Sequence, residues 1–477
     1  MTDPFPEPDH DAFLAEAAAL LGPRGLTRDP ELAEPWLTDW RGRFHGAALA
    51  LASPASTAEV AALVALCARH RVPIVPQGGN SGMSGGATPD ASGRALLLSL
   101  RRMNAVRALD AAGRRVTAEA GVILEALHRV AEAEGLRFPL SLGGKGSATV
   151  GGLVSTNAGG NQVLRHGSMR ALVLGLEAVL ADGSVLDTLV PLKKDNRGFD
   201  LKQLLIGSEG TLGIVTAATL RLVPAVADRR VIWAGLDGIA AARALLLHCE
   251  AAAGDALEAF EVMPGHCLAN VRRYLDAPSP LAGEHRWHAL IELVADADAA
   301  ASLGERAEAM IAGAFERGLV EDATIAASES QAEALWRLRE SVAPAERAAG
   351  PAVQHDVSVP LESVPAFIEQ AVESVEERFP GTRAVAFGHL GDGNVHFHVI
   401  APAGTDPAAW AGEGKAITRR VHDLVTQWRG SISAEHGIGQ LKRDELARLG
   451  DPVALALMKR VKTALDPAGL LNPGKLI

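Results

Sequence analysis

The sequence predicts an α+β fold divided into two or three domains. Its 477 residues are far more than one small core needs, and 48% of them are hydrophobic, as in folded globular proteins. Strand-like and amphipathic helical segments alternate up to about residue 225. Longer helices rich in Ala, Glu and Arg follow, with few glycines before residue 388. We therefore place a domain boundary near residue 225.

Helical and strand segments alternate before this boundary. An N-terminal helical segment over 1–44 precedes an amphipathic helix over 56–71, in which Ser56 and Glu59 have capping-box spacing. A short apolar strand over 72–77 then leads into a glycine-dense loop. The later elements are strands over 94–100, 104–110 and 114–121, a helix over 122–135 closed by Gly135, two strands about the Asp182–Gly183 turn within 169–189, and a long strand over 210–224.

The second half of the chain is predicted in less detail. Strands are expected over 287–296 and 355–360, between the longer helices. Residues 465–477 have the Pro and Gly punctuation of an irregular tail rather than a helix. We expect this tail to dock on another part of the chain.

Charge and cysteine content exclude several classes of function. With 46 basic and 57 acidic residues, the formal net charge is -11 and no basic stripe stands out, so we expect no nucleic-acid partner. Cys67, Cys249 and Cys267 form no C-x-x-C pair, which excludes a disulfide framework, a zinc knuckle and an iron–sulfur cluster. The acidic start of the chain does not resemble a targeting signal, and no run reaches about 18 apolar residues. We therefore expect a cytoplasmic protein with no membrane span.

Three clusters of small residues indicate a site for a large, flat ligand. The first, Gly78–Gly86, follows a strand and can turn its main-chain N–H groups toward an anion such as a pyrophosphate. The others, 143–160 and 206–216, combine glycine with Ser and Thr. A flexible linker or ordinary tight turns are the alternatives, but three such clusters favour one extended cofactor. The loop contains no G-x-G-x-x-G, and the motif at Gly469–Lys475 lacks the Ser/Thr and the helix of a Walker site, so we reject Rossmann and Walker-type binding.

Three histidines lie on a predicted hairpin over 386–400. A two-residue turn at Asp392–Gly393 would place His389 directly opposite His396, with His398 further along the same face. Burying opposed imidazoles without a cation or an acceptor is costly, so a bound metal ion is favoured. The alternative is a pair of solvated histidines on a surface hairpin.

Glu435 and His436 form a second acidic–histidine pair, directly before a glycine turn. With His389 and His396, Glu435 would complete a set of two histidines and one carboxylate that leaves metal positions open for substrate. The alternative for this pair is a charge pair at a helix end.

Several motifs together resemble a known flavoprotein family. Residues 76–86 (PQGGNSGMSGG), 148–160 (ATVGGLVSTNAGG), 194–216 (KDNRGFDLKQLLIGSEGTLGIVT) and 472–475 (NPGK) are similar to the vanillyl-alcohol-oxidase type of FAD-binding fold. LGGKGS at 142–147 and the KDN…DLKQL pattern are most similar to D-2-hydroxyglutarate dehydrogenases within it. The resemblance covers about residues 45–477.

This resemblance implies a domain order. A two-subdomain FAD-binding domain would span 45–225, and a cap domain with an antiparallel sheet for metal and substrate would span 226–430. A C-terminal segment over 431–477 would return to the flavin domain.

The resemblance also implies a flavin-dependent D-2-hydroxyacid dehydrogenase. GHLGDGNVH and SAEHG match the metal-binding motifs of these enzymes, and His436 falls on the catalytic histidine. A divalent metal, for which zinc is the first expectation, would bind the substrate hydroxyl at His389, His396 and Glu435, while His436 takes the proton and the hydride passes to flavin. The FAD is expected to be noncovalent because the glycine loop has no flavin-linking histidine. The residues expected to contact FAD are Gln77, Gly78, Gly79, Asn80, Ser81, Gly82, Met83, Ser147, Thr149, Gly152, Asn157, Gly159, Glu209, Gly213, Ile214 and Asn472.

The expected substrate is a small D-2-hydroxy acid held by Arg339, Gln354, His398 and Asn394. Arg339 would bind the carboxylate next to the reacting carbon. The resembling dehydrogenases hold the carboxylates of their substrate with this Arg and with a Thr, a Lys and an Asn, where this chain has Ala343, Gln354 and His398. Because the distal cation is missing, D-2-hydroxyglutarate is weighed against D-lactate, glycolate and other monocarboxylic 2-hydroxy acids.

The sequence alone leaves two other classes of function open. The same fold hosts a non-redox transferase of the alkylglycerone-phosphate synthase type, and a binding protein without turnover is the third class. For the dehydrogenase we expect a separate electron acceptor, such as an electron-transfer flavoprotein or a quinone. The oligomeric state is open, with a homodimer as one expectation.

Overall fold

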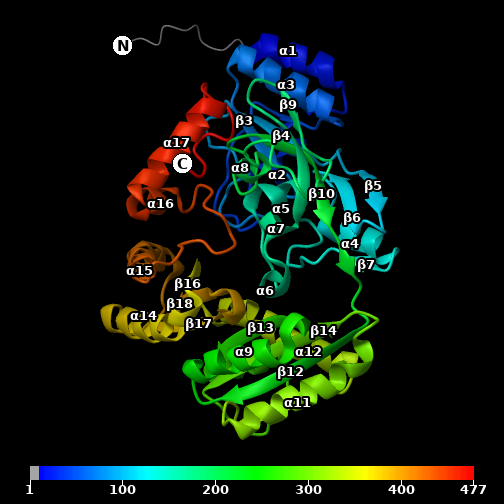
Figure 1. Cartoon of the computed structure of the whole chain (residues 1–477). Coiled ribbons are helices and arrows are strands. Elements are labelled where there is room, and N and C mark those ends of the chain that lie inside the picture. The colour runs from blue at the N-terminus through cyan, green and yellow to red at the C-terminus, as the bar shows by residue number, and fades with distance from the viewer. Residues whose placement is uncertain (1–9) are drawn as a thin grey trace. The chain divides into compact units, whose positions relative to one another are not determined.

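The computed structural model describes residues 10–477, so the first nine residues of the predicted N-terminal helical segment lie outside it. The chain forms two compact units, which Figure 1 shows in the colours of the chain order. The first unit contains the described residues up to Gly160, with His166–Pro224 and Glu435–Ile477. The second unit contains Asn161–Arg165 and Ala225–Ala434.

Three sheets form the framework of the first unit. Their strand orders are β1-β2-β4-β3, β5-β6-β10-β8-β9 and β11-β7. The strands are β1 (Leu26–Thr27), β2 (Ala50–Ala52), β3 (Ile74–Gln77), β4 (Leu96–Ser99), β5 (Val106–Asp110), β6 (Arg115–Glu119), β7 (Leu136–Arg137), β8 (Val173–Val179), β9 (Val185–Asp187), β10 (Ile214–Arg221) and β11 (Val223–Pro224). The helices are α1 (His10–Leu21), α2 (Pro30–Leu37), α3 (Thr57–His70), α4 (Leu124–Glu132), α5 (Val150–Thr156), α7 (Met169–Leu172), α8 (Lys202–Leu205), α16 (Arg443–Leu449) and α17 (Pro452–Leu465). A further short helix, α6 (Val163–His166), lies where the chain passes between the units.

The predicted cap of α3 is confirmed. Ser56 Oγ accepts a hydrogen bond from the Glu59 N–H at 3.1 Å, and the Glu59 carboxylate accepts one from the Ala55 N–H at 2.7 Å. The carboxylate therefore satisfies the N–H one residue before the usual partner in a capping box. One expectation nearby is wrong: residues 169–172 form α7, and the strand begins only at Val173.

The C-terminal tail docks on the first unit, as predicted. Its main chain continues beside β3, where the Ile74 N–H donates to Leu470 O at 2.8 Å and the Asn472 N–H donates to Ile74 O at 2.7 Å. Leu471, between them, is fully buried in an apolar core with Val60, Leu63 and other residues of α3. The last residues of the chain therefore complete the sheet that carries the glycine loop.

A seven-stranded sheet forms the second unit, in the order β15-β12-β14-β13-β17-β18-β16. The strands are β12 (Asp228–Leu236), β13 (Leu257–Pro264), β14 (Trp287–Ala295), β15 (Asp322–Ile325), β16 (Ala352–Ser358), β17 (Arg383–His389) and β18 (Asn394–Ile400). The helices are α9 (Ile239–Ala253), α10 (Gly265–Leu275), α11 (Leu303–Glu316), α12 (Glu329–Glu340), α13 (Val342–Ala349), α14 (Val364–Arg378) and α15 (Pro407–Gln427). One face of the sheet packs through Trp233, Met263 and Phe387 against α10, α12 and α13.

The register of the histidine hairpin differs from the prediction. A short 3₁₀ turn, Leu390–Asp392, and Gly393 at φ 76° connect β17 to β18 in place of a two-residue turn. Phe387, not His389, therefore stands opposite His396. The Asp392 carboxylate stabilises the longer turn by accepting the Asn394 N–H at 3.1 Å. His396 and His398 still share one face because they are two residues apart.

The seven-stranded sheet consists of two halves, β15-β12-β14-β13 and β17-β18-β16, which are joined over a short length. Only Glu261 with His389 and Val262 with Gly388 pair across β13 and β17. Pro264 ends β13 and has no N–H to continue the ladder. The strand pair beside this junction carries the candidate site.

Candidate functional site

The glycine loop of the first unit has free main-chain donors. None of the N–H groups of residues 78–83 donates to another described residue, and all of them follow directly after β3. A Cβ added at Gly79 would lie 1.7 Å from Ser147 O, so the loop packs closely on the second glycine cluster there. A Cβ added at Gly82 would meet no atom within 4 Å. The loop thus combines one position closed by the protein with one open position beside unused donors, which fits a bound pyrophosphate.

The second cluster adds an unsatisfied hydroxyl. Thr149 is buried, and its Oγ1 has no hydrogen-bond partner among the described residues. This atom lies 2.3 Å from where a Cβ on Gly78 would stand, so it faces the loop. A ligand with acceptor groups between the two clusters would satisfy it. These observations fit FAD, although the individual contacts stay predictions.

Several polar side chains predicted to bind the cofactor are already engaged in the protein. Gln77 donates to Trp36 O and Ala87 O, and Asn80 donates to Thr38 O. Asn157 Oδ1 accepts from Ser168 and from the Arg170 N–H, while Asn472 Nδ2 donates to Gly86 O and Glu209 O. These residues shape the surroundings of the loop through their side chains. The other predicted contacts are Ser81, Met83, Gly152, Gly159, Gly213 and Ile214, of which Gly213 and Ile214 are buried at the start of β10.

Glu209 holds the segment that contains His436. Its carboxylate accepts the Ile438 and Gly439 N–H groups, each at 2.7 Å. Burial raises the pKa of Glu209, although these two hydrogen bonds oppose the increase. Ser84 in the glycine loop donates to His436 O at 3.0 Å, so the predicted base is held by the same loop that offers the anion donors. The helix-end alternative does not apply, because residues 431–442 are outside any helix.

In the second unit, a buried carboxylate joins the predicted substrate residue to a predicted metal ligand. Glu261 of β13 is 1% exposed. Its Oε2 accepts from Arg339 Nε and Nη2, both at 2.7 Å, and its Oε1 is paired with His389 Nδ1. Burial would raise the pKa of Glu261, but the charges of Arg339 and His389 outweigh it and hold the pKa well below its ordinary value. The carboxylate is therefore ionised and fixes both neighbours.

The two metal-binding histidines predicted on the hairpin lie together. The His389 and His396 rings are 5.4 Å apart between centroids, and a ring nitrogen of each lies within 4.8 Å of the other. They are diagonal neighbours across the strands, which still brings the rings into contact. Glu261 pairs with Nδ1 of His389, and in this orientation of the ring a metal ion would be bound through Nε2. Burial, reinforced by the charge of His389, lowers the pKa of His396. The His396 imidazole is therefore neutral, as a metal ligand must be. This donor set fits a divalent metal such as zinc.

Asp356 and Asn394 stabilise the neighbourhood of His396. Asp356 Oδ1 lies 3.8 Å from His396 Nδ1 and accepts from Asn394 Nδ2 at 2.9 Å. Asn394 Nδ2 also donates to Val357 O at 3.0 Å. The amide nitrogen of Asn394, which we predicted to bind substrate, is thus occupied in joining β18 to β16. The Ala434 N–H donates to Asp356 O at 3.3 Å, and Glu435 is the next residue of the chain. Its role as third metal ligand stays a prediction.

His398 and Gln354 face each other in the β18–β16 ladder, on the face that carries His396. The Phe387 ring lies between the two histidines, at 5.2 Å from His396 and 5.0 Å from His398. The Arg339 guanidinium lies over the same ring at 5.1 Å. His398 Nδ1 is paired with a second buried carboxylate, Glu346 of α13.

Glu261 and Glu346 are site residues that the sequence analysis missed. All of β13 is buried, so a carboxylate within the run AFEVM was a signal that a buried partner exists. Glu346 gave no such signal, since PAERAA reads as an ordinary helix face. It comes to His398 across 52 positions of the chain.

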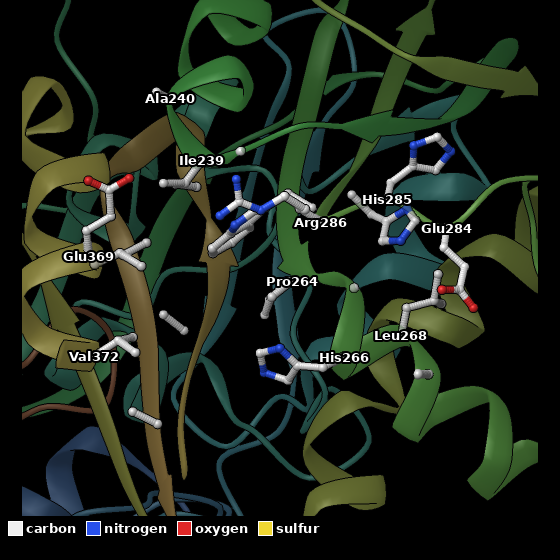
Figure 2. Close-up of a pocket in the computed structure, with 18 of the residues that line it drawn as sticks. Ile239, Ala240, Pro264, His266, Leu268, Glu284, His285, Arg286, Glu369 and Val372 are labelled. Atoms are coloured by element: carbon white, nitrogen blue, oxygen red, sulfur yellow. The ribbon is translucent and has the colours of Figure 1, made fainter. Parts of the chain in front are cut away.

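A separate cavity of about 910 Å³ lies where β13 and β17 diverge. Figure 2 shows Ile239 at the start of α9, Pro264 at the end of β13, and Glu369 and Val372 of α14 around it. No residue predicted to bind metal or substrate lines this cavity. We therefore place the candidate site at the histidine pair rather than here.

Comparison with known proteins covers nearly the whole chain. The family model "FAD linked oxidases, C-terminal domain" matches residues 226–476, and the model "FAD binding domain" matches residues 48–189. The chain is 39% identical to the mitochondrial D-2-hydroxyglutarate dehydrogenase of Bos taurus over 95% of its own length and 81% of that protein. It is 38% identical to D-2-hydroxyglutarate dehydrogenase of Xanthomonas citri pv. viticola, over 94% of both proteins. With that of Stutzerimonas stutzeri it is 34% identical, over 100% of this chain and 99% of the relative.

Solved structures with the same fold are more distant in sequence. An alkyldihydroxyacetonephosphate synthase aligns with a TM-score of 0.74 at 19% identity, over 100% of this chain and 87% of that one. A p-cresol methylhydroxylase aligns with a TM-score of 0.73 at 15% identity, over 98% and 96%. At these identities the likeness shows the fold alone.

Proposed function

Because this chain belongs to the D-2-hydroxyglutarate dehydrogenase family of FAD-linked oxidases, we propose that it oxidises a D-2-hydroxy acid to the 2-oxo acid with FAD. Its fold is the FAD-binding fold of the vanillyl-alcohol-oxidase type, as the sequence predicted. The observation that carries the proposal is Glu261, which fixes an arginine and a metal-binding histidine side by side. A 2-hydroxy acid carries a carboxylate next to a hydroxyl, and the arginine would bind the carboxylate while a metal ion at the histidine would bind the hydroxyl.

The first unit would hold the flavin. The unused N–H groups of residues 78–83 and the Thr149 hydroxyl would bind its phosphates and polar edges. When bound, FAD accepts the hydride from C2 of the substrate. No histidine lies in the glycine loop, so we propose a noncovalent cofactor.

Arg339 would bind the substrate carboxylate. Glu261 occupies its Nε and Nη2 edge and leaves Nη1 outside that ion pair. An arginine already fixed by a buried carboxylate loses little conformational freedom when it binds a second one. The 2-hydroxy acid is thereby oriented with its C2 hydroxyl toward the histidine pair.

His389 and His396 would hold a divalent metal, with Glu435 as the predicted third ligand and zinc as the proposed ion. Such a cation polarises the C2 hydroxyl and lowers its pKa. His436 would take the hydroxyl proton, and Ser84 and Glu209 hold the main chain around it.

The cellular setting is also part of the proposal. We propose a separate electron acceptor. We also propose a cytoplasmic location, and the three buried cysteines, none of them in a disulfide, support a reducing compartment. No helix within residues 10–477 has the length and apolar content of a membrane span.

Anaerobic flavin bleaching tests the proposal. The FAD-loaded protein is mixed with D- and L-2-hydroxy acids in the absence of oxygen, and absorbance near the flavin maximum is followed. We expect bleaching by D acids and little by their L enantiomers. An unchanged spectrum with every acid would leave the transferase or a binding protein as the function. Substrates of an alkylglycerone-phosphate synthase, added in parallel, would identify the transferase by product formation without net bleaching.

A further inference from the structure

We infer that the substrate of this enzyme is a monocarboxylic D-2-hydroxy acid with an uncharged tail, so D-2-hydroxyglutarate is disfavoured. This inference rests on the proposed function and names the substrate class of that same site. It is carried by Glu346, a buried carboxylate at the end of the site where a second substrate carboxylate would lie.

The direction of the substrate follows from the strands. Arg339 fixes the carboxylate end, and the histidine pair takes the C2 hydroxyl. His398 lies two residues beyond His396 on the same face of β18, which places its Cα about 7 Å further along the strand. Gln354 of β16 stands opposite His398. The tail of an extended 2-hydroxy acid would therefore reach these two residues.

Glu346 supplies negative charge at this end. Its side chain is 3% exposed and is paired through Oε2 with His398 Nδ1. Since one carboxylate already accepts from His398, the histidine cannot serve as an uncompensated cation for a second one. Gln354 brings no charge, and Ala343, three residues before Glu346 on α13, brings neither charge nor a hydroxyl.

The side-chain charges near this end give the same result, since the proposed metal ion would lie at the other end, at His389 and His396. Next to Arg339 and the three histidines, the buried carboxylates are those of Glu261, Asp356 and Glu346, whereas the buried guanidinium among these contacts is that of Arg339. Arg339 is already paired with Glu261. Arg383 is the nearest further arginine on this face of β17, but it is exposed and lies beyond His398 along the ladder. Solvent screens an exposed cation, so it compensates a buried carboxylate weakly.

The remaining wall of this end is apolar. The Phe387 ring packs against both His396 and His398, and Val385, opposite His398, is buried. A tail of methylene or methyl groups would lose no hydrogen bonds to water on binding there. A carboxylate would lose its hydration without gaining a paired cation.

The test compares substrates that differ only in tail charge. D-2-Hydroxyglutarate is compared with its uncharged amide, D-2-hydroxyglutaramate, and with D-2-hydroxyhexanoate, using kcat/KM from anaerobic flavin reduction. We expect kcat/KM for each acid with an uncharged tail to exceed that for the dicarboxylate by about 10-fold or more. A wild-type preference of similar size for the dicarboxylate would overturn the inference, while bleaching by D acids would still support the proposed function. No bleaching by any acid would refute both.

Two variants show whether Glu346 causes the preference. Glu346→Gln removes one buried charge with little change of shape and should shift the ratio toward the dicarboxylate by about 10- to 50-fold. Glu369→Gln removes an exposed carboxylate on α14, at the separate cavity, and should leave the ratio unchanged. Equal ratios in Glu346→Gln and wild type would count against the charge argument. Loss of a wild-type dicarboxylate preference in Arg383→Ala would overturn the inference and assign the distal clamp to Arg383.

Discussion

Replacing Glu261 with Gln should separate the fold from the metal site. The carboxylate is 1% exposed and makes two contacts of 2.7 Å to Arg339 and one to His389. Gln keeps the shape but removes the charge, so Arg339 remains buried without its anion. Breaking a buried ion pair in this way costs about 3–5 kcal/mol of unfolding free energy. The Gln amide has only one acceptor oxygen, which the donors of Arg339 should attract, so its NH2 group would face His389 Nδ1. The loss of an acceptor for His389 should weaken metal binding by about 10- to 100-fold.

The assay has two readouts and a matched control. Unfolding free energy is taken from urea titration, and bound metal from elemental analysis after dialysis against a buffered metal concentration. Glu292→Gln is the control, because Glu292 is also buried and accepts from Trp336 Nε1 at 2.5 Å, but it lies on β14, which β13 separates from the strands of the histidine hairpin. Both variants should lose stability, but only Glu261→Gln should lose metal. Wild-type metal affinity in Glu261→Gln would refute the role of Glu261 in orienting His389.

Three further predictions concern the cofactors and pH. Gly82→Val should reduce flavin occupancy in a folded protein, because the valine side chain would enter the open position beside the main-chain donors. Gly79→Ala should instead destabilise the first unit, because the new Cβ would collide with Ser147 O. Equal flavin content in Gly82→Val and wild type would show that the phosphates bind elsewhere. Removing metal with a strong chelator should abolish oxidation with flavin retained, and His436→Ala should keep metal and flavin but slow turnover by about 100- to 10,000-fold, measured by stopped-flow flavin reduction. Burial lowers the pKa of His288 from 6.5 to about 4, so between these pH values the unfolded chain binds a proton that the folded chain excludes. The free energy of unfolding should therefore fall by up to about 3 kcal/mol as the pH drops from 6.5 to 4. Urea titrations at these two pH values should show a smaller fall for His288→Gln than for wild type.

Local chemistry made part of the fold predictable. The cap at Ser56 follows from residues close in sequence, whose hydrogen bonds are decided within a few positions. The irregular course of the tail likewise follows from its own Pro and Gly residues, but its docking partner, Ile74, lies far away in the sequence. The histidine hairpin was predicted in kind but not in register. Asp392 and Gly393 are compatible with both a two-residue turn and the longer 3₁₀ turn, and only the ladder with β16 and β17 fixes which one forms.

The partners of the site residues could not be predicted because they are distant in the chain. Glu261 reaches Arg339 across 78 positions and His389 across 128. Such pairs depend on the strand order of the sheet, in which β13 neighbours β17 although three strands and five α-helices lie between them in sequence. Motif resemblance suggested the proposed metal ligands, whereas the carboxylates Glu261 and Glu346 could be found only from the topology of the sheet.

The docked C-terminal tail has a consequence for the order of biosynthesis. The ribosome completes residues 225–434 of the second unit before it makes any residue of the segment Glu435–Ile477. Leu471 must then leave the exit tunnel before the sheet beside Ile74 is complete. We therefore expect the second unit to fold during translation, while the flavin-binding unit completes its sheet and acquires its cofactor only after the segment around Leu471 has left the exit tunnel.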